Sequence, residues 1–282
     1  MVKTDQYALL GWPVGHSASP ILQQAAFQSV GISAVYELMA VPPENLPEAI
    51  QRLKNEGYKG WNVTVPHKET VLPLLDALDP IAKKIGSVNT VLPKQGMLWG
   101  YSTDGYGFEK ALERNFHLPL AGSRILFLGT GGATRAAAVY AALRGAAEIT
   151  LVNRTTRRAE ALAACIHHVA ADCQIHVLPL SELDAVADAM RQTQVLIHGT
   201  SLGLHPDDPL PFPVSRIPQE LPVFDMIYGK TRFQQQLHEQ GNPVVPGWDM
   251  LIYQGCRSFE IWTGLSAPEQ AMRQALVDNG KI

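Results

Sequence analysis

The feature that most constrains the fold is a regular alternation of short apolar runs with helical segments along almost the whole chain. Apolar runs of strand length stand at 7–10, 34–39, 61–65, 88–92, 124–128, 148–152, 175–178, 195–198 and 223–225. Segments with a helical pattern lie at 20–30, 44–56, 106–115, 133–144, 233–240 and 249–263. Strands that are joined through helices run parallel in βαβ units. The sequence therefore predicts an α/β protein built on parallel sheets.

Residues at the ends of these segments fit the same interpretation. Ser19 is the expected N-cap of the first helix, with Pro20 at its first position. Gly57 is expected to end the helix over 44–56. The proline-rich stretch 206–222 is expected to be a long irregular connection.

Composition excludes several classes of protein. The 282 residues are 46% hydrophobic and 17% charged, which is typical of an ordered globular chain with one large or two medium domains. The net charge of −3 gives no basic footprint for nucleic acid. Three scattered cysteines without a C-x-x-C pair favour a reducing cytoplasm. The sequence offers no signal peptide and no apolar run long enough for a membrane span, so we expect a cytoplasmic protein that acts on a small molecule.

A glycine-rich turn links the run at 124–128 to the helix at 133–144. Its residues are Gly129, Thr130, Gly131, Gly132 and Ala133. Glycine lets such a turn close and lets the backbone approach a pyrophosphate, while the helix N-terminus supplies free N–H donors. Thr134 takes the place of the third glycine of G-x-G-x-x-G, so a plain tight turn in a parallel sheet stays an alternative.

The end of the next predicted strand indicates which dinucleotide is bound. An NAD site usually has an acidic residue there, which accepts a hydrogen bond from the ribose 2′-hydroxyl. Here Val152 is followed by Asn153, Arg154 and Thr155, with Arg158 nearby and no acid before Glu160. Arginines suit a 2′-phosphate, and cations at a helix start oppose the helix dipole and so need another reason to be there. The pattern favours NADP; a solvated basic helix start is the alternative.

Three polar segments within residues 1–105 stand out. Ser17 and Ser19 lie just before a helix, where two hydroxyls can bind a carboxylate or form a simple turn and cap. Thr64 lies at the end of the predicted strand at 61–65, and Lys68 follows that strand. Asp104 lies in the turn at 102–105. A lone lysine after a strand is usually a surface residue, so each segment by itself is ambiguous.

Together these segments resemble the shikimate dehydrogenase family over nearly the whole chain. The matching pieces are GWPVGHSASP at 11–20, NVTVPHK at 62–68, SVNT at 87–90, TDG at 103–105, GTGGA at 129–133, NRT at 153–155, DMIY at 225–228 and MLIYQG at 250–255. They occur in the family's order. The resemblance implies reversible reduction of 3-dehydroshikimate to shikimate with NADPH, a step of chorismate and aromatic amino acid biosynthesis.

The resemblance also implies the domains and the roles of residues. Residues 1–105 would form an α/β substrate domain with the C-terminal helices of 246–282 packed on it, and 106–245 a Rossmann-like NADP domain, with substrate in the cleft. Lys68 and Asp104 would be the catalytic pair, and no metal is expected. Substrate would be bound by Ser17 and Ser19 through its carboxylate, and by Thr64, Asn89, Asp104, Tyr228 and Gln254. The cofactor would be bound by Gly129, Thr130, Gly131, Gly132, Ala133, Asn153, Arg154, Thr155, Arg158, Met226 and Gly247.

Three positions depart from the family's pattern. Asparagine is usual where Ser102 stands, an asparagine-containing turn is usual at 198–201, where this chain begins with His198, and glycine is usual at Asp249. A carboxylate at Asp249 would repel the cofactor phosphates if it faced them. We expect these departures to tune substrate preference or cofactor affinity and to leave the catalytic pair intact.

Other functions remain as alternatives. A quinate/shikimate dehydrogenase that uses NAD is opposed by Arg154 and Arg158. A methylenetetrahydrofolate dehydrogenase does not suit the motifs at 17–19 and 62–68. A non-catalytic shikimate- or quinate-sensing protein is opposed by the presence of both Lys68 and Asp104. The expected partners are small molecules, with a homodimer as an alternative to a monomer.

Overall fold

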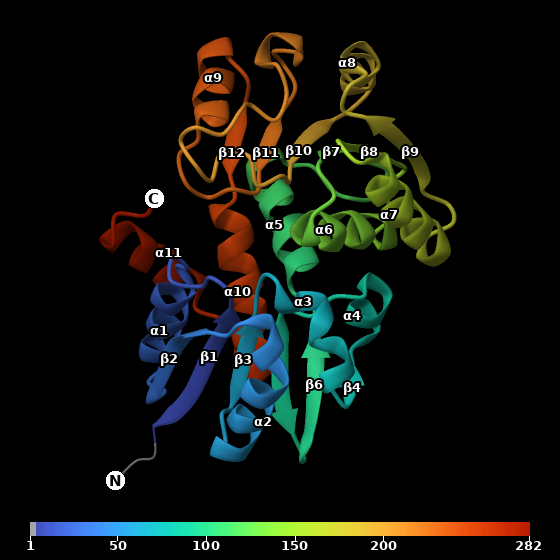
Figure 1. The fold of residues 1–282 in the computed structure, drawn as a ribbon. Helices are drawn as coiled ribbons and strands as arrows, with labels where there is room; N and C mark the ends of the chain where they lie inside the picture. The colour runs from blue at the N-terminus through green and yellow to red at the C-terminus, as the bar shows by residue number, and fades with distance from the viewer. Residues whose placement is uncertain (1–3) are drawn as a thin grey trace. The chain divides into compact units, whose positions relative to one another are not determined.

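The computed structural model describes residues 4–282, which divide into two compact units (Figure 1). The first unit comprises the chain up to Gly107 together with Leu251–Ile282, and the second is Phe108–Met250. Each unit contains one six-stranded sheet. The first unit is therefore assembled from two segments that are distant in the sequence.

The sheet of the first unit is mixed. Its strands are β1 (Asp5–Gly11), β2 (Ala34–Ala40), β3 (Gly60–Val63), β4 (Ala77–Leu78), β5 (Thr90–Lys94) and β6 (Met97–Tyr101), in the order β2-β1-β3-β5-β6-β4. β5 runs antiparallel to both β3 and β6, whereas the other pairs are parallel. The expectation of parallel strands throughout is wrong here. β6 follows β5 after only Gln95 and Gly96, both at positive φ, and a two-residue turn of this kind joins antiparallel strands.

Helices from both ends of the chain cover this sheet. They are α1 (Ser19–Ser29), α2 (Leu46–Glu56), α3 (His67–Thr70), α4 (Pro80–Ile85), the 251–263 part of α10 (Trp248–Thr263) and α11 (Glu269–Asp278). α11 packs against α1 (Figure 1), and the Trp262 indole on α10 donates a hydrogen bond to the Val91 carbonyl at 3.0 Å. α2 ends at Gly57 as predicted, but it begins two residues later than expected because Pro43–Asn45 forms a separate 3₁₀ turn.

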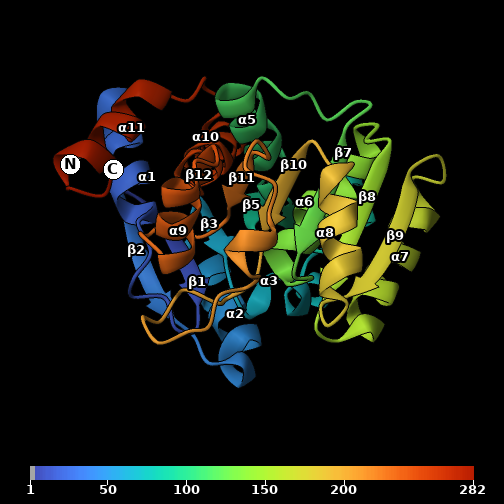
Figure 2. The same ribbon diagram turned by 90° about the horizontal axis from the view of Figure 1, so that it is seen from above.

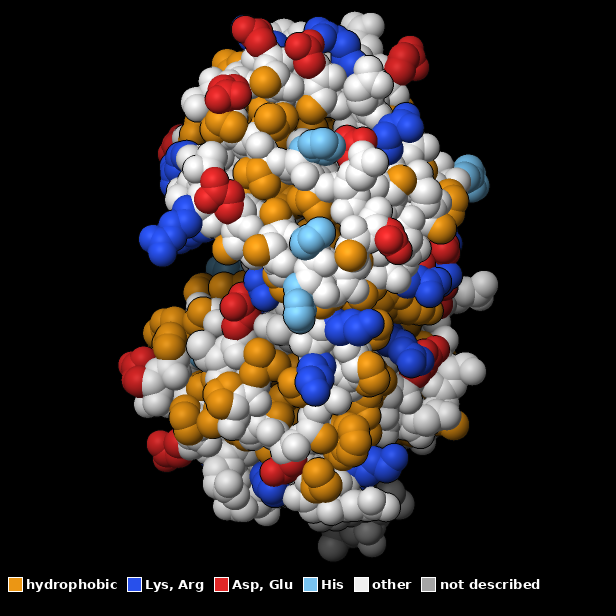
Figure 3. All heavy atoms as spheres, turned by 90° about the vertical axis from the view of Figure 1, so that its right-hand side faces the viewer, with side chains coloured by type: hydrophobic (Ala, Val, Ile, Leu, Met, Phe, Trp, Pro, Cys, Tyr) orange, Lys and Arg blue, Asp and Glu red, His pale blue; other side chains and the backbone are white. Residues whose placement is uncertain are grey.

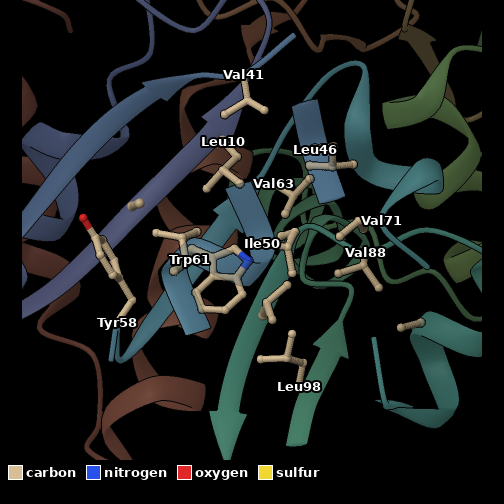
Figure 4. Close-up of a cluster of buried hydrophobic side chains, with 14 residues drawn as sticks. Leu10, Val41, Leu46, Ile50, Tyr58, Trp61, Val63, Val71, Val88 and Leu98 are labelled. Carbon is tan, nitrogen blue, oxygen red and sulfur yellow. The ribbon is translucent and has the colours of Figure 1, made fainter. Parts of the chain in front are cut away.

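One apolar core of the first unit lies between the sheet and α2. Leu10, Trp61, Val63 and Val88 point into one cluster with Ile50 of α2 (Figure 4). Burying side chains of this size contributes about 1.5–3 kcal/mol each. Burial of these apolar residues therefore fixes the strands that lead into the polar segments described in the sequence.

The sheet of the second unit is parallel throughout. Its strands are β7 (Arg124–Leu128), β8 (Glu148–Asn153), β9 (Gln174–Pro179), β10 (Val195–His198), β11 (Val223–Asp225) and β12 (Val244–Pro246), in the order β12-β11-β10-β7-β8-β9 (Figure 2). Counted by appearance, the order is 3-2-1-4-5-6, that of a doubly wound dinucleotide-binding sheet. The order reverses between β7 and β10, where such folds bind their ligand.

Helices connect these strands. They are α6 (Gly132–Leu143), α7 (Thr156–Val169), α8 (Leu183–Arg191) and α9 (Arg232–Gln240), and α5 (Asp104–Phe116) leads into the unit. The stretch 206–222 is irregular as predicted, apart from a 3₁₀ turn at Val214–Arg216. Basic and acidic side chains are both spread over the face drawn in Figure 3. Within residues 4–282, none of the helices has the length and apolarity to span a membrane.

Candidate active site

A lysine and an aspartate form the centre of the polar site in the first unit. Lys68 lies on α3, just after β3, and Asp104 opens α5, just after β6. Lys68 Nζ donates to Asp104 Oδ2 at 2.6 Å, and their side chains are only 15% and 7% exposed. A charge-assisted hydrogen bond this short fixes both groups. The structure thus brings together the two residues predicted as a catalytic pair.

The Asn89 side chain holds the other oxygen of this aspartate. Asn89 Nδ2 donates to Asp104 Oδ1 at 2.9 Å and to Gln254 Oε1 at 3.1 Å. Asn89 Oδ1 accepts from the Thr103 backbone N–H at 2.8 Å, so the orientation of the amide is determined. Both carboxylate oxygens of Asp104 are thereby engaged, and Gln254 is held at the same place.

A buried polar network, which was not predicted from the sequence, lies next to Asn89. Asn62 Nδ2 donates to the Asn89 carbonyl at 2.9 Å, to Thr90 Oγ1 at 3.0 Å and to Ser258 Oγ at 3.0 Å. Ser258 Oγ also lies 2.8 Å from Thr90 Oγ1 and is fully buried. One signal was available, because Ser258 follows Gln254 by four residues and therefore lies on the same face of α10.

The serine pair lies at the start of α1. Ser17 Oγ accepts from the Ser19 backbone N–H at 3.2 Å, which forms a serine turn, and the two hydroxyls are 3.1 Å apart. The predicted N-cap role of Ser19 is wrong: Ala18 is the N-cap and Ser19 the first helical residue, because the turn through Ser17 begins the helix one residue earlier.

Tyr36 connects the serine pair to the buried network. Its hydroxyl donates to Asn62 Oδ1 at 2.7 Å. Burial raises the pKa of Tyr36, and a hydrogen bond with Ser19 opposes that rise. Tyr36 therefore joins Asn62 and Asn89 in one hydrogen-bonded system, at a point next to Ser19. Thr64, which follows β3, is only partly buried and lies between Asn62 and the lysine in the sequence.

In the second unit, the glycine turn lies at the end of β7, as predicted. Gly129 has φ +95°, and a Cβ there would lie 2.7 Å from Thr200 Cγ2, so only glycine fits. Thr134, in place of the third glycine, is buried and donates to the Gly199 carbonyl at 3.2 Å. A Cβ on Gly199 would lie 2.0 Å from Thr134 Oγ1, so this threonine depends on the glycine opposite it.

The turn fits a dinucleotide phosphate. α6 begins at Gly132, and nothing lies within 4 Å of where a Cβ on Gly132 would be. Thr130 Oγ1 is buried without a hydrogen-bond partner among the described residues, and Ala133 follows in the first turn of α6. Free backbone N–H groups at a helix start and an unpaired hydroxyl are what a phosphate would bind.

A pocket of about 160 Å³ adjoins the turn. Its lining includes Gly129, Asn153, Arg154 and Thr200. Arg154 and Arg158 are exposed, and no ion pair is formed by either with the described residues. Asn153 Nδ2 donates to the Thr155 carbonyl at 2.9 Å, which shapes the loop before α7. The residues present therefore fit the 2′-phosphate of NADP.

Two further residues predicted to contact the cofactor lie beside each other at the ends of β11 and β12. A Cβ on Gly247 would lie 2.5 Å from the Met226 carbonyl oxygen, so the two segments are in close contact. Tyr228, predicted to contact substrate, packs against Trp248 with ring centroids 4.7 Å apart, and burial raises its pKa. Tyr228 belongs to the second unit, unlike the other predicted substrate residues.

The three departures from the family's pattern have different surroundings. Ser102 Oγ is buried without a hydrogen-bond partner among residues 4–282. His198 is fully buried between Asp225 and Thr200. Asp249 is buried, accepts from Asn115 Nδ2 at 2.7 Å and lies 3.8 Å from Arg114 Nε. Within the part of the chain that the structure describes, no group of His, Cys, Asp and Glu could hold a metal ion.

A doubly wound sheet with a glycine turn and unpaired arginines, together with a buried lysine–aspartate pair, defines an α/β oxidoreductase that uses a dinucleotide. The matching family descriptions are "Shikimate dehydrogenase substrate binding domain" at residues 9–91, "Shikimate / quinate 5-dehydrogenase" at 110–204 and "Shikimate 5'-dehydrogenase C-terminal domain" at 247–277. The chain belongs to the shikimate dehydrogenase family, which confirms the resemblance inferred from the motifs.

Individual relatives agree. The NADP⁺-dependent shikimate dehydrogenase of Bacillus cereus strain B4264 is 38% identical over 275 residues, which are 96% of this chain and 97% of the relative. Shikimate 5-dehydrogenase from Listeria monocytogenes, solved with shikimate and NAD, has a TM-score of 0.90 at 30% identity and covers 98% of this chain and 97% of its own. The Thermus thermophilus enzyme, solved with NADP(H) and shikimate, has a TM-score of 0.84 at 34% identity, with 98% and 99% covered. The predicted two-domain α/β fold with a Rossmann-like domain is confirmed.

The contacts of Asp249 generate a prediction about cofactor affinity. Because its carboxylate is engaged by Asn115 and close to Arg114, Asp249→Gly should leave the Kd for NADPH unchanged in a fluorescence titration. The loss of this buried hydrogen bond should lower the free energy of unfolding by about 1–3 kcal/mol, measured with urea. Asp249→Asn, which keeps an acceptor but removes the charge, is the control. Tighter NADPH binding by both variants would show instead that the carboxylate repels the cofactor.

Proposed function

We propose that this chain is an NADP-dependent shikimate dehydrogenase, which reversibly reduces 3-dehydroshikimate to shikimate in the biosynthesis of chorismate and the aromatic amino acids. The observation that carries the proposal is the buried contact between Lys68 and Asp104, at a strand edge lined with amides and hydroxyls. The names of the relatives support the same reaction and the same cofactor.

The residues of the first unit suit a polyhydroxylated ring acid. Ser17 and Ser19 present two hydroxyls 3.1 Å apart, which we assign to the substrate carboxylate. Asn89 and Gln254 lie in hydrogen-bond contact and we assign them, with Thr64, to the ring hydroxyls or the carboxylate. Tyr228 is assigned as a further substrate contact from the second unit. We propose the first unit as the substrate domain and the second as the NADP domain.

The lysine has the chemistry that ketone reduction requires. NADPH, when bound, supplies the hydride to the carbonyl carbon. Negative charge then grows on the carbonyl oxygen, and the Lys68 ammonium can stabilise it and deliver a proton to it. Asp104 holds the Lys68 Nζ at 2.6 Å and so fixes the position from which the proton is given. In the oxidation direction, neutral Lys68 takes the hydroxyl proton.

The residues proposed for NADP form two groups in the second unit. The turn Gly129–Ala133 is assigned to the pyrophosphate, because it combines a free helix start with the unpaired Thr130 hydroxyl. Arg154 and Arg158, with Asn153 and Thr155, are assigned to the adenosine 2′-phosphate. Met226 and Gly247 are assigned to the nicotinamide end.

The cysteines and the proposed partners concern where the protein works and how it assembles. Cys165, Cys173 and Cys256 are all free thiols, which supports a reducing compartment such as the cytoplasm. The proposed partners are the two small molecules, shikimate and NADP(H), and self-association into a homodimer is an alternative to a monomer.

The function is tested by following the absorbance of the reduced dinucleotide, NADPH or NADH, at 340 nm with shikimate or quinate, each with NADP⁺ or NAD⁺. Shikimate with NADP⁺ should give the highest kcat/KM of the four combinations, because Arg154 and Arg158 have no group to pair with in NAD⁺. A higher value for quinate with NAD⁺ would make the chain a quinate dehydrogenase. Binding of shikimate without turnover in all four assays would make it a sensing protein.

Replacement of the proposed acid tests the mechanism. Lys68→Ala should lower kcat by about 10²–10⁴-fold with a much smaller change in KM, because the charge matters most when the alkoxide forms. Asp104→Asn should also lower kcat, and the double variant should lose less than the sum in free energy, because the two groups act together. Lys59→Ala, at an exposed lysine of the same unit, is the control. A folded Lys68→Ala protein with near-normal kcat would contradict the assignment.

The arginines should discriminate between the two dinucleotides. Replacing Arg154 and Arg158 together with alanine should raise the Kd for NADP⁺ about tenfold or more, because each charge-assisted hydrogen bond contributes about 1.5–3 kcal/mol, and should change the Kd for NAD⁺ little. Isothermal titration with both dinucleotides measures this. Arg157→Ala removes one arginine charge from the same helix start and is the matched control for each arginine replaced singly. Equal losses for NADP⁺ and NAD⁺ would mean that the arginines serve only the fold.

A further inference from the structure

A fully buried histidine at the end of β10 has no part in the function described so far. His198 pairs in register with Asp225 of the neighbouring β11, and both side chains are inaccessible. His198 Nδ1 lies 2.8 Å from Asp225 Oδ1, and Nε2 lies 2.7 Å from Thr200 Oγ1. The Phe233 ring packs edge-on against the imidazole at 5.2 Å. The ring is therefore held on three sides and cannot contact a ligand itself.

The Asp225 carboxylate is saturated. Oδ1 accepts from His198 Nδ1 and from the Ile227 N–H at 3.0 Å, and Oδ2 accepts from Gln234 Nε2 at 2.9 Å and Thr231 Oγ1 at 3.3 Å. A carboxylate has about four lone-pair sites that can accept hydrogen bonds, and four donors occupy them here. Since Asp225 must accept from His198, Nδ1 carries a proton, and in the neutral imidazole Nε2 is then the acceptor.

This proton placement determines what the Thr200 hydroxyl does. The hydroxyl accepts from the Leu202 N–H at 3.1 Å and, with the imidazole neutral, donates to His198 Nε2, so every group of the relay from Asp225 to Leu202 is satisfied. The Thr200 methyl group packs over Gly129 of the glycine turn, and Thr200 lines the pocket that also contains Arg154. The loop that begins at Gly199 is thus tied to a buried anion through one imidazole.

We propose that His198 is a positioning residue for NADP, which sets cofactor affinity by holding the Thr200 loop against the glycine turn through a hydrogen-bonded relay from Asp225. The inference rests on the proposed cofactor and goes beyond it, because it assigns a role to a residue that does not touch the cofactor. Because the relay already orders the loop in the cofactor-free protein, little conformational entropy is lost there when the cofactor binds.

The experiment separates the hydroxyl from the methyl group of Thr200. Thr200→Val keeps the packing but removes the hydroxyl, and should raise the Kd for NADPH about three- to tenfold, the effect of one buried hydrogen bond. Thr200→Ser keeps the hydroxyl and should stay closer to wild type. His198→Phe keeps a ring but removes both hydrogen bonds, and should weaken NADPH binding to a similar degree. Binding is measured by NADPH fluorescence in the absence of substrate.

Two further measurements distinguish positioning from a general loss of stability. Hydrogen exchange of residues 199–204 in the cofactor-free protein should speed up in Thr200→Val and His198→Phe, because the Leu202 N–H loses its fixed acceptor. Val186→Ala, a buried change on α8 of the same unit, should lower the melting temperature without changing the NADPH Kd. Combining His198→Phe with Thr200→Val should cost no more affinity than the larger single effect.

Additive losses in the double variant, or wild-type NADPH affinity in folded Thr200→Val, would overturn the positioning role. Thr200→Val alone keeps the proposal testable even if His198→Phe fails to fold. Absence of NADPH binding by the wild-type protein would instead overturn the proposed function, and the inference with it.

Discussion

Both sheets place the polar ends of several strands at one edge, and the candidate site depends on that constraint. In the second unit it follows simply from parallel strands, whose carboxyl ends all lie on the same side. In the first unit the same result needs a reversal, because β5 runs antiparallel to its neighbours. Asn62 pairs with Thr90, and Thr90 pairs with Tyr101, so the start of β5 lies beside the end of β3 and the end of β6. Asn89, just before β5, therefore lies within hydrogen-bond distance of Asp104, just after β6.

Each unit by itself fixes its candidate residues around one saturated buried group. In the first unit this group is the Asn89 amide, and in the second it is the Asp225 carboxylate. A buried polar group that loses a partner costs about 1–3 kcal/mol, so a fully paired group tolerates few other arrangements of its neighbours. The Lys68–Asp104 pair and the Thr200 loop are thus held in the same way, by hydrogen-bonded groups whose partners are complete.

The sequence was most informative where a residue type has few alternative uses. The glycine turn and the arginines without a partner acid follow from local chemistry. The pairing of Lys68 with Asp104 was expected only through the family resemblance, and the structure brings the two residues together. Periodicity could not show that β5 is antiparallel, because strand direction depends on the turn at Gln95 and Gly96, whose backbone conformation is not visible in a hydrophobic pattern. Ser19 was mistaken for an N-cap because serine suits both a cap and the first turn. The network through Asn62 and Ser258 joins residues 196 positions apart, a pairing that only the folded chain reveals.

The division of the chain has a consequence for its synthesis. Multidomain proteins usually complete their N-terminal domain first as the chain leaves the ribosome. Here the first unit lacks α11, the Trp262 indole and the Gln254 amide until residues 251–282 have emerged, whereas Phe108–Met250 is continuous. The second unit can therefore fold before the last helices of the first unit have been synthesised. The lysine–aspartate pair gains its complete surroundings only once residues 251–282 have been added.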